Sequence, residues 1–122
     1  MQIMPATGAS VATSLRQPHQ DSDLFNVDHN VLLGSAYYRQ LLGRFSGNRV
    51  FALSAYNAGP HRVERWRHVA GEEVSVDVWI ETIPYLETRN YVQAVLAYNV
   101  VFQYLLGDTQ RLLTPLERQG SY

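Results

Sequence analysis

At the centre of the sequence lies Asn48-Arg-Val-Phe-Ala-Leu-Ser-Ala-Tyr-Asn-Ala-Gly-Pro60, a segment that carries helix start and stop signals at its two ends. Asn48 is a good N-cap, Gly59 suits a left-handed C-terminal cap, and Pro60 cannot continue the hydrogen-bond ladder. Because most residues between them are apolar, the segment predicts a short helix buried in a small domain. Tyr56 and Asn57 fall in its last turn, where polar groups either satisfy the backbone or face a cleft.

The composition limits what this chain can be. Its 122 residues suffice for one domain with one core, and 46% hydrophobic with 17% charged residues is typical of a globular protein. A net charge of −1 does not favour a nucleic-acid partner. The sequence contains no cysteine, which excludes disulfides and thiol chemistry. No apolar run approaches the length that crosses a membrane.

Apolar spacing and capping residues predict helices on both sides of the central one. We expect them at residues 6–15, 29–45, 61–69, a short stretch after Ser75, and 87–106, with a polar loop at 17–26 and no periodicity in 112–122. Asp28 is the expected N-cap of the second helix, whose buried stripe is expected to comprise Leu32, Ala36 or Tyr37, Leu41 and Phe45. The last long helix should end at Gly107, and its apolar stripe is expected to comprise Tyr91, Ala94 or Val95, Tyr98, Val101 or Phe102, and Leu105. The expected fold is therefore all-α, with about six helices in a single domain over residues 1–122.

The predicted helix at 61–69 is rich in cationic and imidazole side chains. Arg62, Arg65 and Arg67 alternate with His61 and His68 around a valine and a tryptophan. Such a helix either contacts phosphates or another anionic polymer, or presents a solvated face while its tryptophan enters the core. We predict no metal site at these two histidines and no cofactor.

Polar side chains gather at the ends of the predicted helices. They are Gln2, Tyr56, Asn57, Glu87 and Arg89. Ends of distant elements commonly converge on a cleft between helices in small all-α domains. Aromatic, amide and carboxylate groups together suit a sugar ring, which has apolar faces and hydroxyl edges.

Three segments resemble, in order, the signature blocks of soluble lytic transglycosylases. They are Met1-Gln-Ile-Met-Pro5, Ala55-Tyr-Asn-Ala-Gly-Pro60 and Ile80-Glu-Thr-Ile-Pro-Tyr-Leu-Glu-Thr-Arg-Asn-Tyr-Val92. The resemblance covers about residues 1–110 and is greatest to the large periplasmic type. It implies a lysozyme-like helical domain of the goose type, a periplasmic location, peptidoglycan glycan strands as the partner, and a monomer without a membrane span.

The resemblance also implies a reaction. Enzymes of this family cleave the β-1,4 bond between N-acetylmuramic acid and N-acetylglucosamine. A single glutamate protonates the glycosidic oxygen and then takes the proton from the muramyl C6 hydroxyl, which attacks C1 and forms a 1,6-anhydro product. Such acid–base catalysis needs a carboxyl group with a raised pKa, but no second carboxylate.

The family's catalytic glutamate belongs to a Glu-Ser motif on a helix before the first block, whereas this sequence begins within that block. We therefore expect the first helix and the acid/base glutamate to be missing and the chain alone to be inactive. By motif match, Gln2, Met4, Tyr56 and Asn57 line the cleft beside the acid, with Tyr56 supporting it. Glu87 contacts the sugar from the opposite side. A missing helix should also expose the apolar faces of residues 50–53 and 96–102.

Several functions remain open at this level. The chain is either part of a transglycosylase or a non-catalytic glycan-binding module that kept the groove and lost the acid. A goose-type lysozyme hydrolase is the competing enzyme, which analysis for anhydro products distinguishes. A nucleic-acid-binding role rests only on the basic cluster at residues 61–69.

Overall fold

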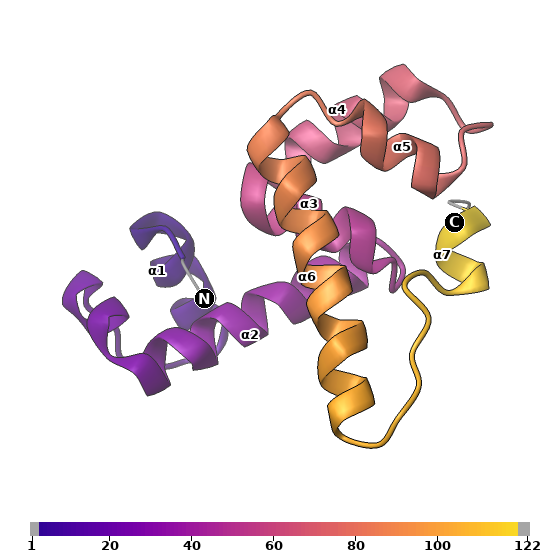
Figure 1. Ribbon diagram of the computed structural model, residues 1–122. Helices are drawn as coiled ribbons and strands as arrows, with labels where there is room; N and C mark the ends of the chain where they lie inside the picture. The colour runs from indigo at the N-terminus through magenta and orange to yellow at the C-terminus, as the bar shows by residue number, and fades with distance from the viewer. Residues whose placement is uncertain (1–2, 120–122) are drawn as a thin grey trace. The chain divides into compact units, whose positions relative to one another are not determined.

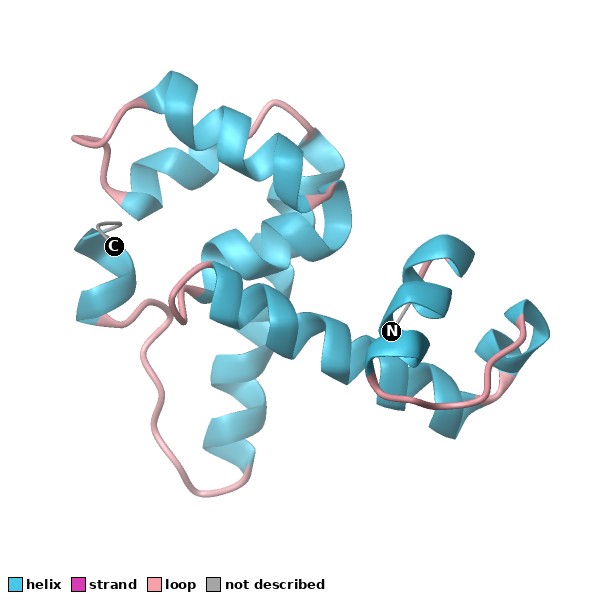
Figure 2. Ribbon diagram, turned by 180° about the vertical axis from the view of Figure 1, so that it is seen from behind, coloured by secondary structure: helices cyan, strands magenta, loops and turns pink. Residues whose placement is uncertain are grey.

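The computed structural model describes residues 3–119, and every regular element among them is a helix. Figure 2 shows the helices joined by loops, with no strand in the described part of the chain. The all-α prediction is therefore confirmed. The chain divides into two compact units, Met1–Gln40 and Leu41–Tyr122. Our expectation of one domain over residues 1–122 stays a prediction.

Residues 3–119 form seven α-helices and one 3₁₀ helix, and Figure 1 shows their course along the chain. They are α1 (Pro5–Ser14), η1 (Asp21–Phe25), α2 (Val27–Arg44), α3 (Arg49–Ala58), α4 (Pro60–Ala70), α5 (Val76–Thr82), α6 (Leu86–Leu105) and α7 (Pro115–Gln119). The predicted loop at 17–26 contains η1, and the predicted aperiodic tail contains α7. Among the described residues, none of these helices has the length and apolar character needed to cross a membrane.

The first unit has a small core of its own. Ile3, Val11, Ala12 and Leu33 are buried together, and Leu24, Ala36 and Tyr37 pack against them. Two sequence predictions about α2 are wrong. Asn26, rather than Asp28, accepts the backbone N–H of His29 at 3.1 Å, so the helix begins earlier than expected. Leu33 is fully buried while Leu32 is 46% exposed, so the first residue of the predicted stripe is wrong, whereas Leu41 and Phe45 are buried as predicted.

Helix α3 is the centre of the second unit, where it packs against α4 and α6 (Figure 1). Asn48 caps it as predicted, because its Oδ1 accepts the backbone N–H groups of Val50 at 2.9 Å and Phe51 at 3.3 Å. Gly59 follows with φ 96°, a conformation that favours glycine, and Pro60 opens α4. The expectation that residues 50–53 are exposed is wrong, since all four are buried.

Helix α6 buries a different face from the predicted one. Thr88, Val92 and Leu96 are buried at helical spacing. Tyr98 and Phe102, members of the predicted stripe, are each 63% exposed. The expected exposure of residues 96–102 is thus confirmed for the second half of the helix but not for Leu96. Gly107, with φ 84°, ends the helix region as predicted.

Helix α7 is fastened to the start of α3 by a buried carboxylate. Glu117 is 4% exposed, and its Oε1 accepts from Arg49 Nε at 2.6 Å while its Oε2 accepts from Arg49 Nη2 at 3.0 Å. The backbone carbonyl of Glu117 accepts from Asn48 Nδ2 at 3.2 Å. Burial acts to raise the pKa of Glu117, but the hydrogen bonds from Arg49 and Thr114 and the Arg49 charge outweigh it and lower that pKa.

Candidate functional site

The second and third signature segments meet where α3 ends and α6 begins. Thr88 donates its hydroxyl to Asn57 Oδ1 at 2.7 Å, which joins two residues that are 31 positions apart. Thr88 is buried, whereas Asn57 is exposed. The bond holds the oxygen end of the Asn57 amide, and so leaves its NH₂ group as the end that can donate to a ligand.

Of the other predicted site residues, Tyr56 and Glu87 belong to the second unit, and Met4 belongs to the first. Tyr56 is half-buried beside Asn57, with its hydroxyl oxygen shielded from solvent. Glu87 lies in the first turn of α6 and is exposed. Met4 belongs to the first unit, directly before α1, and is 70% exposed. Gln2 lies outside the described residues.

Three groups near the start of α6 have partners that the sequence did not predict. Thr88 received no role, although it is the residue that ties α3 to α6. Arg89 donates to the backbone carbonyl of Ile83 at 2.9 Å, so it closes the end of α5. The Arg62 guanidinium lies 5.4 Å from the centre of the Tyr85 ring, which packs edge-on against Trp66 at 5.2 Å. A spacing pattern shows none of these contacts, because the partners come from different helices.

Some of the charged side chains of helix α4 contact residues of other helices in the fold. Arg67 stacks over Phe51 with 4.3 Å between its guanidinium carbon and the ring centre, and Phe51 meets Trp79 edge-on at 4.8 Å. Arg44 and Glu64 form an exposed ion pair at 2.7 Å. Trp66 is half-buried rather than fully inserted in the core. These contacts favour the reading of α4 as a packed helix with a solvated face.

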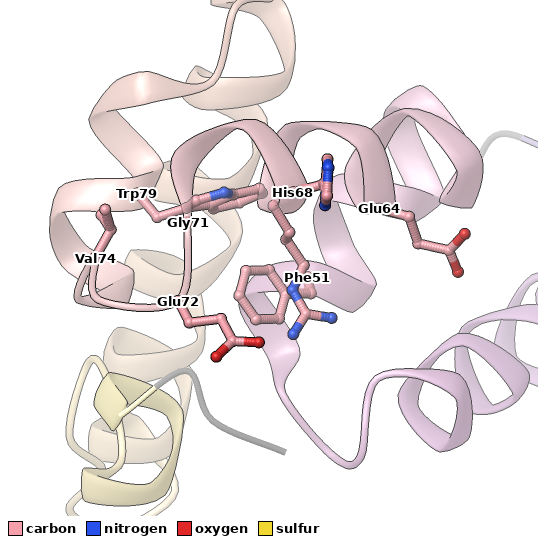
Figure 3. Close-up of a pocket in the computed structure, with 8 residues that line it drawn as sticks. Phe51, Glu64, His68, Gly71, Glu72, Val74 and Trp79 are labelled. Atoms are coloured by element: carbon pink, nitrogen blue, oxygen red, sulfur yellow. The ribbon is translucent and has the colours of Figure 1, made fainter.

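A hollow of about 250 Å³ lies elsewhere in the second unit, between α3, α4 and α5 (Figure 3). It is lined by Phe51, Glu64, Arg67, His68, Gly71, Glu72, Val74 and Trp79. Figure 3 shows the Glu72 side chain beside the Phe51 ring, whereas the Glu64 side chain points away from them. None of the predicted sugar-contacting residues lines this hollow, and its volume is below the roughly 300 Å³ at which ligand pockets usually begin.

Eleven acidic side chains occur in the chain, all within the described residues. Glu117 is the only one of these that is fully buried, and its pKa is lowered by Arg49 despite the opposing effect of burial. Glu81 accepts from Gln93 at 3.0 Å in an exposed position. A general acid for glycoside cleavage needs a carboxyl group kept protonated by apolar surroundings. Among the described carboxyl groups, none combines burial with such surroundings.

Comparison with known proteins connects these features to a family. The model of the transglycosylase SLT domain matches residues 1–75, and that of the soluble lytic transglycosylase helical domain matches residues 82–111. The soluble lytic murein transglycosylase of Escherichia coli K12 is 35% identical over 119 residues, which are 96% of this chain and 18% of that protein. The soluble lytic murein transglycosylase of Salmonella typhimurium is 34% identical over 124 residues, and the match covers 100% of this chain and 19% of the Salmonella protein.

Solved structures show the same similarity. One is an inactive glutamate-to-glutamine mutant of lytic transglycosylase Slt from Pseudomonas aeruginosa. The match covers 97% of this chain and 19% of the Pseudomonas chain, with 43% sequence identity and a TM-score of 0.89. The 70 kDa soluble lytic transglycosylase of Escherichia coli matches 100% of this chain and 20% of its own, with 34% identity and a TM-score of 0.93. The chain spans about a fifth of the length of these relatives. It belongs to the transglycosylase SLT domain family.

Proposed function

We propose that this chain is the substrate-positioning part of a peptidoglycan lytic transglycosylase. The reaction is cleavage of the β-1,4 bond between N-acetylmuramic acid and N-acetylglucosamine with formation of a 1,6-anhydro product. The relatives named soluble lytic murein transglycosylases support the substrate class. A periplasmic location and a monomeric state belong to the same proposal.

The observation that carries the proposal is the hydrogen bond between Thr88 and Asn57. It joins the segment with Tyr56 and Asn57 to the segment with Glu87, the two family segments in the second unit. In this arrangement the NH₂ group of Asn57 donates to a sugar hydroxyl or acetamido oxygen. The exposed Glu87 carboxylate accepts from sugar hydroxyls. Substrate-binding roles for Met4 and Gln2 are proposed from the motif match alone.

We assign the proton donor to a glutamate outside these eleven carboxylates. Glu117 is unsuited, because its lowered pKa keeps it ionised and its two oxygens are held by Arg49. The relative from Pseudomonas aeruginosa is described as inactive when one glutamate becomes glutamine, which supports a single essential glutamate in this family. Tyr56 then supports that carboxyl group through its hydroxyl. This leads us to propose that the chain by itself binds glycan without cleaving it.

A chimera tests the proposal directly. Residues 1–122 replace the matching region of the Escherichia coli relative, and release of 1,6-anhydromuropeptides from murein sacculi is followed by mass spectrometry. We expect activity from the chimera and none from the isolated chain, since loss of a positioned proton donor costs about 10²–10⁴-fold. Tyr56→Phe, Asn57→Ala and Glu87→Gln should each lower chimera activity, with Glu87→Gln acting mainly on KM.

Asn90→Ala, on an exposed position of α6, is the matched control and should leave chimera activity unchanged. Products without anhydro ends would identify a hydrolase instead. A folded chimera that binds glycan but releases nothing would favour the non-catalytic binding module. Full activity in all three site variants would refute the residue assignments.

A further inference from the structure

A cluster of metal-ligating side chains lies in the first unit, outside all the residues discussed for glycan binding. His19 precedes η1, Asp23 lies within η1, and His29 lies in the first turn of α2. One potential ligand atom from each of the three lies within 4.8 Å of the others. His19 Nδ1 and His29 Nε2 are 2.9 Å apart. The sequence carries no clear signal for this group, because ten residues separate the histidines and the intervening loop has no periodicity.

Local contacts order the cluster through a hydrogen bond to the Asp23 side chain, a cap on the backbone of His29 and the burial of His19. Asp23 Oδ2 accepts the backbone N–H of Gln20 at 2.7 Å, which leaves the other carboxylate oxygen as a ligand. The backbone N–H of His29 is bound by Asn26 Oδ1 at 3.1 Å. The His19 side chain is only 6% exposed. A preformed set of donors lowers the ordering cost of binding.

The two imidazoles share one hydrogen in the metal-free state. A neutral imidazole has one N–H and one acceptor nitrogen, so a bond between two ring nitrogens uses one proton. If His19 Nδ1 and His29 Nε2 are both to bind an ion, the proton between them must move to the other nitrogen of the ring that carries it. For His19 this is Nε2, a buried atom without a hydrogen-bond partner among the described residues, 3.9 Å from Asp21 Oδ1. A carboxylate behind a ligating histidine is the usual outer partner in metal sites.

The distances suit a small transition-metal ion after a slight opening of the pair. At a zinc–nitrogen distance of about 2.05 Å, tetrahedral geometry places two ligand nitrogens about 3.3 Å apart. The rings therefore turn so that both lone pairs face one point, and separate by a few tenths of an ångström from 2.9 Å. A hollow of about 410 Å³, lined by Asp23, Asn26, Asp28, His29 and Leu32, adjoins the cluster and provides an entry path for the ion.

We propose that His19, His29 and Asp23 form a binding site for a divalent transition-metal ion of the zinc class. Two imidazoles and a carboxylate are a set that zinc accepts, with water completing the coordination. Asp21 and Asp28, which are exposed nearby, add negative charge that offsets the partial positive charge at the start of α2. This inference does not depend on the proposed glycan chemistry, since no residue is shared.

The test is zinc binding to the purified metal-free chain, measured by isothermal titration calorimetry and by a thermal melt with and without zinc chloride. We expect one ion per chain with a micromolar or tighter Kd and a raised Tm. His29→Gln and Asp23→Asn should each weaken binding at least tenfold. Both changes keep a polar side chain of similar size, and circular dichroism verifies that each variant is folded.

The chain contains four histidines, which gives a matched control. The double variant His61→Gln/His68→Gln removes the two exposed histidines of α4 and should leave the Kd unchanged. No zinc binding at micromolar concentration would overturn the proposal. So would an Asp23→Asn variant that binds as tightly as the wild type, or a double variant that loses binding.

Discussion

Helix α3 and the second half of α6 are both rich in apolar residues, yet the apolar side chains of α3 are buried and most of those in the second half of α6 are exposed. In α3, Phe51 is 3% exposed and contacts both Arg67 and Trp79. In α6, Phe102 is 63% exposed, and Leu105 is 71% exposed. The difference shows that burial is decided by the neighbouring helices, because an apolar stripe is buried only where another element covers it.

The sharpest test of this comparison is a matched pair of phenylalanine substitutions. Phe51→Ala should lower the free energy of unfolding by about 3–5 kcal/mol, because it empties a packed site between two helices. Phe102→Ala should change it by less than about 0.5 kcal/mol, since the ring already faces solvent. Urea unfolding followed by circular dichroism measures both. Equal losses would mean that the second half of α6 is covered in solution.

The next largest loss of stability is expected at Glu117, the buried carboxylate that fastens α7 to the start of α3. Glu117→Gln should cost about 2 kcal/mol at pH 7, because it removes charged hydrogen bonds to Arg49. Glu81→Gln is the exposed control and should have little effect.

The same variant has a pH signature. The pKa of Glu117 is lowered in the folded state below its usual 4.5, so the stabilisation is complete above that value. It is lost as pH falls through the lowered folded pKa. The stability difference between the wild type and Glu117→Gln should therefore shrink from pH 6 towards pH 3 in urea titrations. A difference that grows on acidification would contradict this sign.

The cap of α3 should contribute less to the free energy of unfolding than Glu117 does. Asn48→Ala removes the acceptor for two backbone N–H groups and the donor to Glu117, and should cost about 1–2 kcal/mol. Asn90→Ala, at an exposed position within α6, should be nearly neutral. Thermal unfolding compares the two. A neutral Asn48→Ala would show that packing, rather than the cap, sets where α3 begins.

The smallest stability effect is expected on the exposed half of α6, where a different measurement is informative. Phe102→Gln with Leu105→Gln should leave the free energy of unfolding within about 0.5 kcal/mol of the wild type. It should nevertheless reduce the fluorescence of a bound hydrophobic dye, because it removes exposed apolar surface. The control is Val69→Gln, at an exposed position on α4. Unchanged dye fluorescence in the double variant would place the dye elsewhere.

The sequence by itself determined the presence of α1 to α6, though not of η1 and α7, and the limits of α3. Asn48, Gly59 and Pro60 act through backbone groups within a few residues, so their effects can be predicted without knowing the rest of the molecule. The three family segments likewise identified the family from their order alone. Local signals were weaker at Asn26, whose capping role the sequence analysis gave to Asp28.

Tertiary structure decided which faces are buried and which polar groups meet. Thr88, Val92 and Leu96 of α6 are buried because α3 lies against them, whereas the predicted stripe reaches a region with fewer neighbours. Asn57 reaches Thr88 across 31 positions, and Glu117 reaches Arg49 across 68. Such pairs depend on the path of the whole chain, and the period of a single helix carries no information about them.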